Sequence, residues 1–273
     1  MTVFPADAAT GALPPPARRP AQRTRPTSFP PLRGLLPLVL LLIAWQVTAD
    51  RLSPYFPPPS SWASALLDLW NQGVLLPAAA ATVRTFCLGL AAATVLGTAL
   101  GLAVGASPRV DRALRPTLES ARAMPPAAVV PIATLLLGFT GTMKVVVVTS
   151  AAVWSILLNT RSGVQQLDPV LHEMARSLQL GRLDRIRKVT LPALLPSIFL
   201  GVRVAAPVAL VITLLVEILT QVDGIGALIA LSQRNYQFAR GYGLILVAGL
   251  FSLVVNALVS ALQAQLLRHR PHG

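Results

Sequence analysis

Few side chains in this sequence have the types and spacing that enzyme chemistry requires. The three histidines, His172, His269 and His272, show no metal-ligand spacing. The single cysteine, Cys87, lies inside an apolar run, so no intrachain disulfide can form and we expect a small buried hydrophobe. No nucleophile is followed by a suitably spaced base. We therefore expect no catalytic residue, no metal site and no cofactor, and we do not expect an enzyme.

The sequence also lacks a phosphate-binding loop, which would read G-x-x-x-x-G-K-[ST]. Its two lysines, Lys144 and Lys188, are preceded by Met143 and Arg187, whereas that motif places a glycine before the lysine. If transport or movement in this protein is driven by ATP, another subunit must therefore bind the nucleotide.

The residues that suggest a function lie in a polar stretch, 161–197. Asp168 followed by Pro169 is typical of a helix N-cap and first helical position, and Gly181 is placed to end that helix. The apolar residues between them recur at helical spacing and form one stripe: Val170, Leu171, Met174, Ala175 and Leu178. A second short amphipathic helix is expected over 182–190. The pair could pack on its own bundle or dock into a groove of a soluble partner.

The composition of the chain indicates that the segments around this loop lie in a membrane. The chain has 273 residues, of which 54% are hydrophobic and 12% charged, against about 25% charged in an average soluble domain. A lipid bilayer is the natural solvent for so much apolar surface. The net charge of +13 would favour nucleic-acid binding, but the arginines cluster in short gaps between apolar runs and aromatic residues are few. We expect membrane lipid, and no nucleic acid, as a partner.

Long runs without charge predict an all-α membrane protein with six transmembrane helices, since a spanning helix needs about 20 apolar residues. One run is extended by letting Lys144 snorkel to the interface. The expected spans are 34–50 and about 83–105, 122–139, 143–160, 198–219 and 241–264.

The remaining segments follow from these spans. Residues 1–33 are rich in Pro and Arg and are expected to form a disordered tail. Basic residues also gather near 109–122, at 161–188 and after the last span, which predicts that both termini are cytoplasmic. Residues 51–80 are then extracytoplasmic, and their Trp-containing part is expected to form an interfacial helix. A cleaved signal peptide is the competing interpretation of the first run.

Two features inside the spans bear on packing. Gly97, Gly101 and Gly105 are spaced by four residues, which favours close helix packing inside the bundle over a seam between two copies. Prolines at Pro125, Pro126 and Pro131 kink helices, and they could form either a bend lining a substrate path or a simple packing kink.

Two charged residues lie near the ends of the fifth span. Glu217 is a candidate for the translocation path because intramembrane carboxylates are expensive, although a place near the interface would leave it solvated. Arg203 sits at the cytoplasmic mouth, where it could attract an anion or form a structural ion pair.

The loop resembles a known motif. Residues 173–192 are similar to the EAA loop of bacterial ABC importer permeases, which runs Glu-Ala-Ala, then Gly, then Leu-Pro at a fixed distance. The matching positions are Glu173, Ala175, Leu191 and Pro192. Met174 replaces the first Ala, and Gln179 stands at the position of the Gly. The nearest glycine is Gly181, so the turn between the two short helices could be shifted.

Other segments, over roughly 55–268, resemble the nitrate, sulfonate and taurine subfamily of these permeases. Residues 124–131 are similar to its P-P-x-A-x-x-P third span, residues 157–169 to its approach to the loop, and residues 223–226 to the segment after its fifth span.

This resemblance implies a type-1 ABC transmembrane domain over 81–267, in a multi-pass protein of the bacterial inner membrane. Its implied partners are an ATP-binding cassette subunit, an extracytoplasmic substrate-binding protein and a second copy of the chain. Its implied coupling loop contains Glu173, Ala175, Leu178, Gln179, Gly181, Leu191 and Pro192. A small anionic solute is expected. A vitamin-precursor importer and an ion-gradient-driven secondary transporter are the alternatives, although the latter predicts inverted repeats and mid-membrane charges that the sequence does not show.

Overall fold

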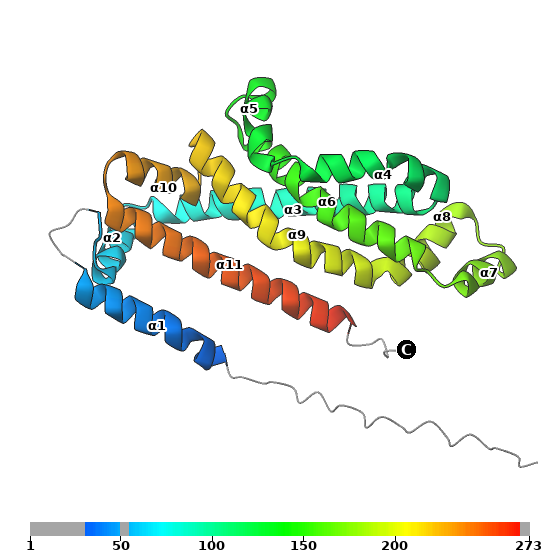
Figure 1. Ribbon diagram of the computed structural model, residues 1–273, viewed down its shortest axis with the longest axis horizontal. Helices are drawn as coiled ribbons and strands as arrows, with labels where there is room; N and C mark the ends of the chain where they lie inside the picture. The colour runs from blue at the N-terminus through cyan, green and yellow to red at the C-terminus, as the bar shows by residue number, and fades with distance from the viewer. Residues whose placement is uncertain (1–30, 50–54, 268–273) are drawn as a thin grey trace, which may run out of the picture. The chain divides into compact units, whose positions relative to one another are not determined.

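A computed structural model describes residues 31–49 and 55–267 (Figure 1). The tail predicted for 1–33 falls almost wholly outside them, as do Arg268 and Arg270. The helices are α1 (Pro31–Thr48), α2 (Pro59–Asn71), α3 (Leu75–Gly105), α4 (Pro108–Ala123), α5 (Pro126–Leu137), α6 (Gly141–Gln165), α7 (Pro169–Ser177), α8 (Arg182–Arg185), the π-helical turn η1 (Ile186–Thr190), α9 (Leu191–Thr220), α10 (Ile225–Arg234) and α11 (Phe238–Leu267). The chain divides into two compact units, Met1–Ile43 and Ala44–Gly273, and the second contains every helix after α1.

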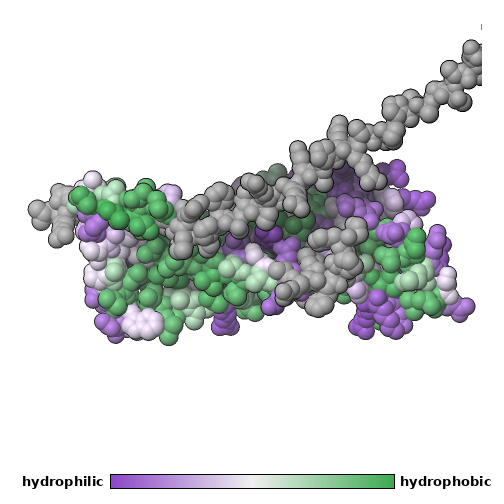
Figure 2. All heavy atoms as spheres, turned by 90° about the horizontal axis from the view of Figure 1, so that it is seen from below, coloured by the Kyte–Doolittle hydropathy of each residue, from purple (hydrophilic) through white to green (hydrophobic). Residues whose placement is uncertain are grey.

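The described residues contain helices and no strand, which confirms the all-α prediction. Four helical stretches are long and apolar enough to cross a membrane, and the bent pair α4–α5 makes a fifth if it counts as one span. The stretches are Leu75–Gly105, Gly141–Gln165, Leu183–Thr220 and Phe238–Gln263. Figure 2 shows hydrophobic residues over much of one face. Six spans and cytoplasmic termini stay predictions.

The span expected at 122–139 is not one helix. α4 ends at Ala123, and α5 begins at Pro126 at an angle of 88° to it. Met124 and Pro125 both have extended backbones, with ψ of 126° and 124°. Each precedes a proline, whose ring disfavours the helical conformation in the residue before it. The two consecutive prolines therefore break the chain sharply where the sequence suggested a kink, while Pro131 lies inside α5.

Close packing of α3 on α6 explains the spaced glycines. A β-carbon at Gly97 would lie 2.9 Å from Ile156 Cβ, and one at Gly101 would lie 2.7 Å from the Leu157 carbonyl oxygen. The predicted packing inside the bundle is thus confirmed. Cys87, expected to be buried, is instead exposed on α3.

α6 occupies the centre of the main apolar core. Its completely buried residues recur at helical spacing, and the helix contacts α3 on one side and α9 on the other. They include Val147, Val148, Ala152 and Ile156. α6 therefore holds the two neighbouring spans in place along their length.

The helix expected in the 51–80 segment is α2, but its tryptophans differ in environment. Trp62 is only 6% exposed, because its ring packs between those of Trp45 and Tyr242, with centroids 4.9 and 5.3 Å away. Its indole N–H donates to the Pro57 carbonyl oxygen at 3.1 Å. Trp70 is exposed, as an interfacial residue would be. Trp62 therefore packs against other parts of the chain, and the interfacial position of the helix stays a prediction.

Candidate functional site

The first helix of the predicted loop, α7, is fixed at both ends by its own backbone and side chains. At its start, Asp168 Oδ1 accepts a hydrogen bond from the Val170 N–H at 2.9 Å, as expected for an N-cap. At its end, the Leu180 N–H donates to the Ala175 carbonyl at 3.1 Å, and the Gln179 N–H donates to the Arg176 carbonyl at 2.9 Å. This pair of bonds is the Schellman motif.

In that motif the residue in the left-handed conformation is Gln179, with a φ of +50°. Glycine is favoured at such a position because it has no β-carbon to clash. The turn is therefore not shifted to Gly181, as the sequence suggested. Gln179 itself adopts the left-handed conformation at the position of the glycine in the motif. Both backbone hydrogen bonds that end the helix are made there.

The apolar stripe of α7 divides into two parts. Ala175 is 1% exposed and Leu171 is partly buried, so one edge of the stripe is covered. Val170 and Leu178 are each 62% exposed and Met174 is 44% exposed. These three define the exposed α7 stripe, and it remains available to a partner. Glu173 is exposed on the same helix.

The second helix of the loop is not separate from the fifth span. A continuous helical stretch runs from Leu183 to Thr220, through α8, η1 and α9. Within it, the Leu191 N–H donates to the Ile186 carbonyl, five residues back. Pro192, which follows, has no N–H to donate. The backbone hydrogen bonds therefore change from five-residue to four-residue spacing beside a residue that donates no such bond. Leu191 and Pro192 thus mark the π-to-α junction, a feature that their spacing alone could not predict.

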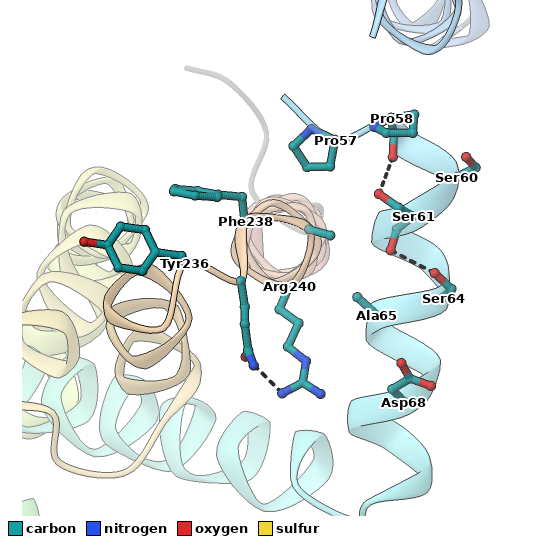
Figure 3. Close-up of a pocket in the computed structure, with 12 residues that line it drawn as sticks. Pro57, Pro58, Ser60, Ser61, Ser64, Ala65, Asp68, Tyr236, Phe238 and Arg240 are labelled. Carbon is teal, nitrogen blue, oxygen red and sulfur yellow. Dashed lines mark hydrogen bonds between the residues drawn. The ribbon is translucent and has the colours of Figure 1, made fainter. Parts of the chain in front are cut away.

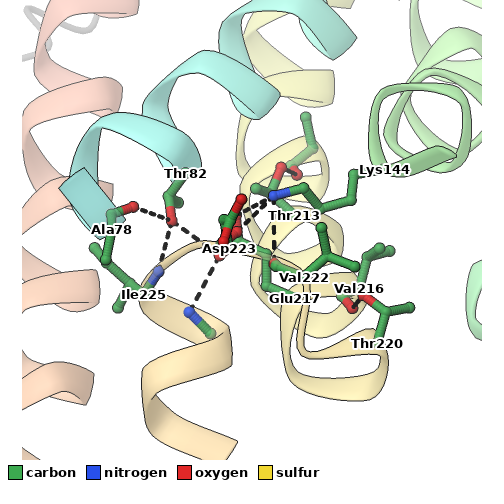
Figure 4. Close-up of polar contacts among 12 residues, drawn as sticks. Ala78, Thr82, Lys144, Thr213, Val216, Glu217, Thr220, Val222, Asp223 and Ile225 are labelled. Carbon is green, nitrogen blue, oxygen red and sulfur yellow. Dashed lines mark hydrogen bonds and ion pairs between the residues drawn. The ribbon is translucent and has the colours of Figure 1, made fainter. Parts of the chain in front are cut away.

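A buried ion pair lies at the opposite end of the bundle from α7 (Figures 1 and 4). Lys144 Nζ, near the start of α6, is 3.5 Å from Glu217 Oε1 on α9, and the two side chains are 3% and 0% exposed. The ammonium also donates to the carbonyl oxygens of Val222 at 3.4 Å and Asp223 at 2.5 Å. We call this group, with Thr82, the ion-pair cluster.

Thr82 joins α3 to the cluster. Its hydroxyl donates to Glu217 Oε2 at 2.8 Å and accepts from the Ile225 N–H at 2.9 Å (Figure 4). The Gly226 N–H also donates to Glu217 Oε2, at 3.1 Å. The cluster therefore ties α3, α6 and α9 to the turn that begins α10.

Two glycines make room for the buried carboxylate. Gly224 has a φ of +140°, and a β-carbon there would overlap the carboxyl group of Glu217. A β-carbon at Gly226 would lie 2.7 Å from Glu217 Cβ. The glycines of the motif Asp223-Gly224-Ile225-Gly226 thus have a direct steric reason, because the backbone there lies against the buried carboxyl group of Glu217.

The cluster overturns two expectations about its charged members. Lys144 does not snorkel to an interface, and Glu217 is not solvated, because each is enclosed by three helices and a turn. A charge buried in protein is stable only when it is paired and hydrogen-bonded. The sequence contained one sign of this pairing: Lys144 is the only charged residue in 123–160, and Glu217 is the only one in 204–222.

The other path candidates lie apart from the cluster. Arg203 Nη1 donates to Gln263 Oε1 at 3.2 Å, which links α9 to α11 at an exposed position. Pro125 and Pro126 form the break between α4 and α5. The structure therefore brings Lys144, Glu217 and Thr82 together, but it does not join Arg203 or the prolines to them.

The chain resembles known proteins over most of its length. The family model described as "Binding-protein-dependent transport system inner membrane component" matches residues 93–270. The putative aliphatic sulfonates transport permease protein SsuC of Bacillus subtilis is 27% identical over 88% of each chain. The nitrate import permease protein NrtB of Leptolyngbya laminosa is 32% identical over 69% of this chain and 67% of the relative.

The fold has a solved counterpart. The chain superimposes on the "Crystal structure of an amino acid ABC transporter with histidines" with a TM-score of 0.57 and 17% identity. The match covers 73% of this chain and 97% of the other. At that identity the likeness concerns the arrangement of helices alone.

Proposed function

This chain belongs to the binding-protein-dependent transport system inner membrane components, as a permease of the nitrate, sulfonate and taurine type, and we propose that it forms the path for a small anionic solute, driven by a separate ATP-binding subunit. Membership makes it a multi-pass inner-membrane transport subunit. Sulfonates and nitrate, which two relatives carry according to their names, share anionic oxygens. We take that shared chemistry as the solute class.

The observation that carries the coupling proposal is the exposed α7 stripe. A helix fixed by an N-cap and a Schellman motif keeps its shape without help from a partner, yet it leaves Val170, Met174 and Leu178 uncovered. Apolar residues at this spacing suit insertion into a groove of another protein. In our proposal the groove belongs to the ATP-binding subunit, α7 lies in the cytoplasm, and Glu173 contacts the rim of the groove.

The permease is further proposed to work as a homodimer. α4 has no buried residue and carries several arginines, yet it lies beside α3, and its Asp111 pairs with Arg161 of α6. α5 has 12 residues, about 18 Å of helix, which is too short to cross the bilayer. Polar or broken helices at membrane depth require protein or a water-filled cavity around them. A second copy facing α4 and α5 would supply both.

The proposed movement of the permease depends on a rigid connection from the loop that contains α7 to α9. Closure of the ATP-binding subunits on nucleotide would displace both α7 helices. Because α8, η1 and α9 form one continuous stretch, displacement at the loop would be transmitted along α9 to the ion-pair cluster. The bundle would rock between inward-open and outward-open states, with the solute delivered by an extracytoplasmic binding protein.

The test is co-purification of the detergent-solubilised chain with an ATP-binding subunit, followed by an ATPase assay. Leu178→Asp is expected to abolish that association, because it places a charge in an apolar groove. Leu67→Asp is the matched control, since Leu67 on α2 is 61% exposed and Leu178 is 62% exposed. Glu173→Ala should leave ATP hydrolysis in place and uncouple it from uptake. Retention of the subunit by Leu178→Asp would contradict the docking proposal.

A further inference from the structure

One arginine lies inside a membrane helix without a partner. Arg84 is the tenth residue of α3 and is exposed. Among the described residues, no hydrogen bond or ion pair involves its guanidinium. Most of its neighbours on the helix are apolar. A charged residue within a spanning segment is costly and usually has a function.

The depth of Arg84 follows from the length of α3. Its 31 residues make a helix of about 46 Å, against about 30 Å for the hydrocarbon core. With the excess shared between both ends, Arg84 would lie about 5 Å inside the hydrocarbon boundary. Snorkelling of the side chain along the helix to a lipid headgroup is the alternative to any specific contact.

Arg84 lines a cleft of about 640 Å³. The cleft is formed by α3, by the first residues of α6 including Gly141 and Thr142, and by Val222 and Asp223 after α9. Its volume is in the range of small-molecule sites. We call it the Arg84 cleft.

The charged groups around this cleft include one cation, Arg84, that no side chain of the described residues contacts directly through a hydrogen bond or ion pair. Lys144 also lines it, but its ammonium is engaged by Glu217 and by two carbonyl oxygens, so the pair is neutral overall. The N-terminal end of α6 contributes the positive end of a helix dipole. Asp223 also lines the cleft, and its carboxylate forms no ion pair in the described part of the chain. Its negative charge opposes the positive charge of Arg84 and of the helix dipole.

We propose that Arg84 contacts an oxyanion in this cleft, and that the oxyanion is the transported solute on its way through the permease. This inference rests on the proposed function. A guanidinium can donate two parallel hydrogen bonds to two oxygens of one sulfonate, nitrate or carboxylate group. Asp223 limits the affinity by repulsion, which allows the anion to leave. A lipid phosphate offers the same chemistry, so the test must separate the two sources.

The first experiment uses thiol reagents as probes of charge and water access. Thr142, exposed on the cleft wall, is replaced in Thr142→Cys/Cys87→Ser, which removes the chain's only natural cysteine. The purified permease in neutral maltoside detergent, and the same protein in phosphatidylcholine bilayers, is treated with a sulfonate-bearing or a trimethylammonium-bearing methanethiosulfonate. The quantity measured is the ratio of the anionic to the cationic reaction rate.

A free thiol reacts faster with the cationic reagent because the thiolate is negative, so the rate ratio at Thr142→Cys is compared with that of a free thiol. We expect it to be shifted towards the anionic reagent in both media. Ethanesulfonate should slow the anionic reaction, while uncharged dimethyl sulfone should not. Adding Arg84→Gln should lower the rate ratio about tenfold, the scale of one charged hydrogen bond. Adding Asp223→Asn should raise it, by a smaller factor. Two variants of opposite sign at one cleft are hard to explain by general damage to the fold.

Arg240→Gln is the control for the loss of one positive charge at this end of the molecule. Arg240 lines a separate cleft between α2 and the start of α11, where its Nη1 donates to Gln237 Oε1 at 3.1 Å (Figure 3). This change should leave the rate ratio at Thr142→Cys unaltered. Equal effects of Arg84→Gln and Arg240→Gln would overturn the proposal.

The lipid alternative gives a different pattern. If a lipid phosphate occupies Arg84, the anionic preference seen in detergent disappears in bilayers, and ethanesulfonate gives no protection there. A cysteine that reacts with neither reagent in bilayers would place the cleft against lipid and also overturn the proposal. None of these results needs the ATP-binding subunit. A permease that copurifies with its ATPase but shows no anionic preference would refute the Arg84 inference alone, and the reverse result would refute the coupling proposal alone.

Discussion

Charged side chains are usually exposed and apolar side chains buried, but the two ends of this bundle show the opposite. At one end Lys144 and Glu217 are enclosed by α3, α6, α9 and a glycine-rich turn, and besides each other they contact two carbonyl oxygens, a hydroxyl and a backbone N–H. At the other end α7 is held by its own caps and exposes Val170, Met174 and Leu178. The buried pair joins elements of one chain, whereas the exposed apolar residues of α7 form the surface that we propose for docking to another chain.

We therefore expect the two ends to serve different purposes, stability at the ion-pair cluster and association at α7. Breaking the ion-pair cluster should affect the stability of the permease itself, because an unpaired charge would remain inside it. Changes on α7 should affect association with a partner and leave the stability of the isolated chain nearly unchanged. Four substitutions test this contrast, and they are given from the largest expected effect to the smallest.

Lys144→Met should have the largest effect. It leaves Glu217 buried without its cation, and breaking one partner of a buried pair lowers the free energy of unfolding by about 4 kcal/mol. Thermal denaturation in mild detergent measures the loss. In Lys144→Met/Glu217→Gln the remaining side chain is neutral and still bonds Thr82, so most of the stability should return. If the double variant were no more stable than the single one, the pair would not be the cause.

Gly224→Ala should destabilise by about 3 kcal/mol, because glycine alone tolerates its backbone conformation and the methyl group would overlap Glu217. Gly138→Ala is the matched control. Gly138 has a φ of +67° and a ψ of −175°, close to the ψ of 174° at Gly224, but the nearest atom to a β-carbon placed there is 3.9 Å away. The difference between the two melting temperatures isolates the contact with the carboxylate. If both substitutions lowered the melting temperature equally, backbone strain alone would explain the effect at Gly224.

Thr82→Val should cost about 2 kcal/mol, since one hydroxyl both donates to Glu217 and accepts from Ile225. The control is Thr94→Val, whose hydroxyl, within residues 31–49 and 55–267, bonds only the Leu90 carbonyl of the same helix. Chemical denaturation of both variants should show a clear gap in stability. A loss as large at Thr94 would mean that the cluster is not special.

Gln179→Gly should have the smallest effect and the opposite sign. Glycine suits the left-handed position after α7, so this loop should gain about 1 kcal/mol in local stability. Amide hydrogen exchange over 169–181 reports the gain directly, while the global melting temperature should stay almost constant. Faster exchange in this variant would show that the Gln179 side chain makes a contact that matters.

Sequence reasoning succeeded where the pattern was local. The cap at Asp168, the helix of the loop and the glycine packing of α3 could be predicted, because each depends on residues a few positions apart. The fifth span and the second loop helix were expected as separate elements, since nothing in the spacing indicates a π turn. The turn after α7 could not be placed from sequence, because a glutamine at position 179 gives no sign that it adopts a left-handed conformation.

The ion-pair cluster escaped prediction for a different reason. Its members, Thr82, Lys144 and Glu217, come from three helices far apart in the sequence, and only the packing of those helices brings them together. A lysine at the edge of an apolar run is naturally interpreted as a residue that escapes to water. The same long-range packing decides that Arg84 is left without a partner, which explains why its importance could not be inferred from composition.

The π turn at Ile186–Thr190 has a consequence for how this protein can change by insertion or deletion. Each added or removed residue in a regular α-helix rotates everything beyond it by about 100°. A π turn contains one residue more than the regular helix accommodates, so a single deletion there could be absorbed by reverting to α geometry. The angle between α7 and α9 would then survive a deletion in η1, whereas a deletion within α9 would rotate α7 relative to the rest of the bundle.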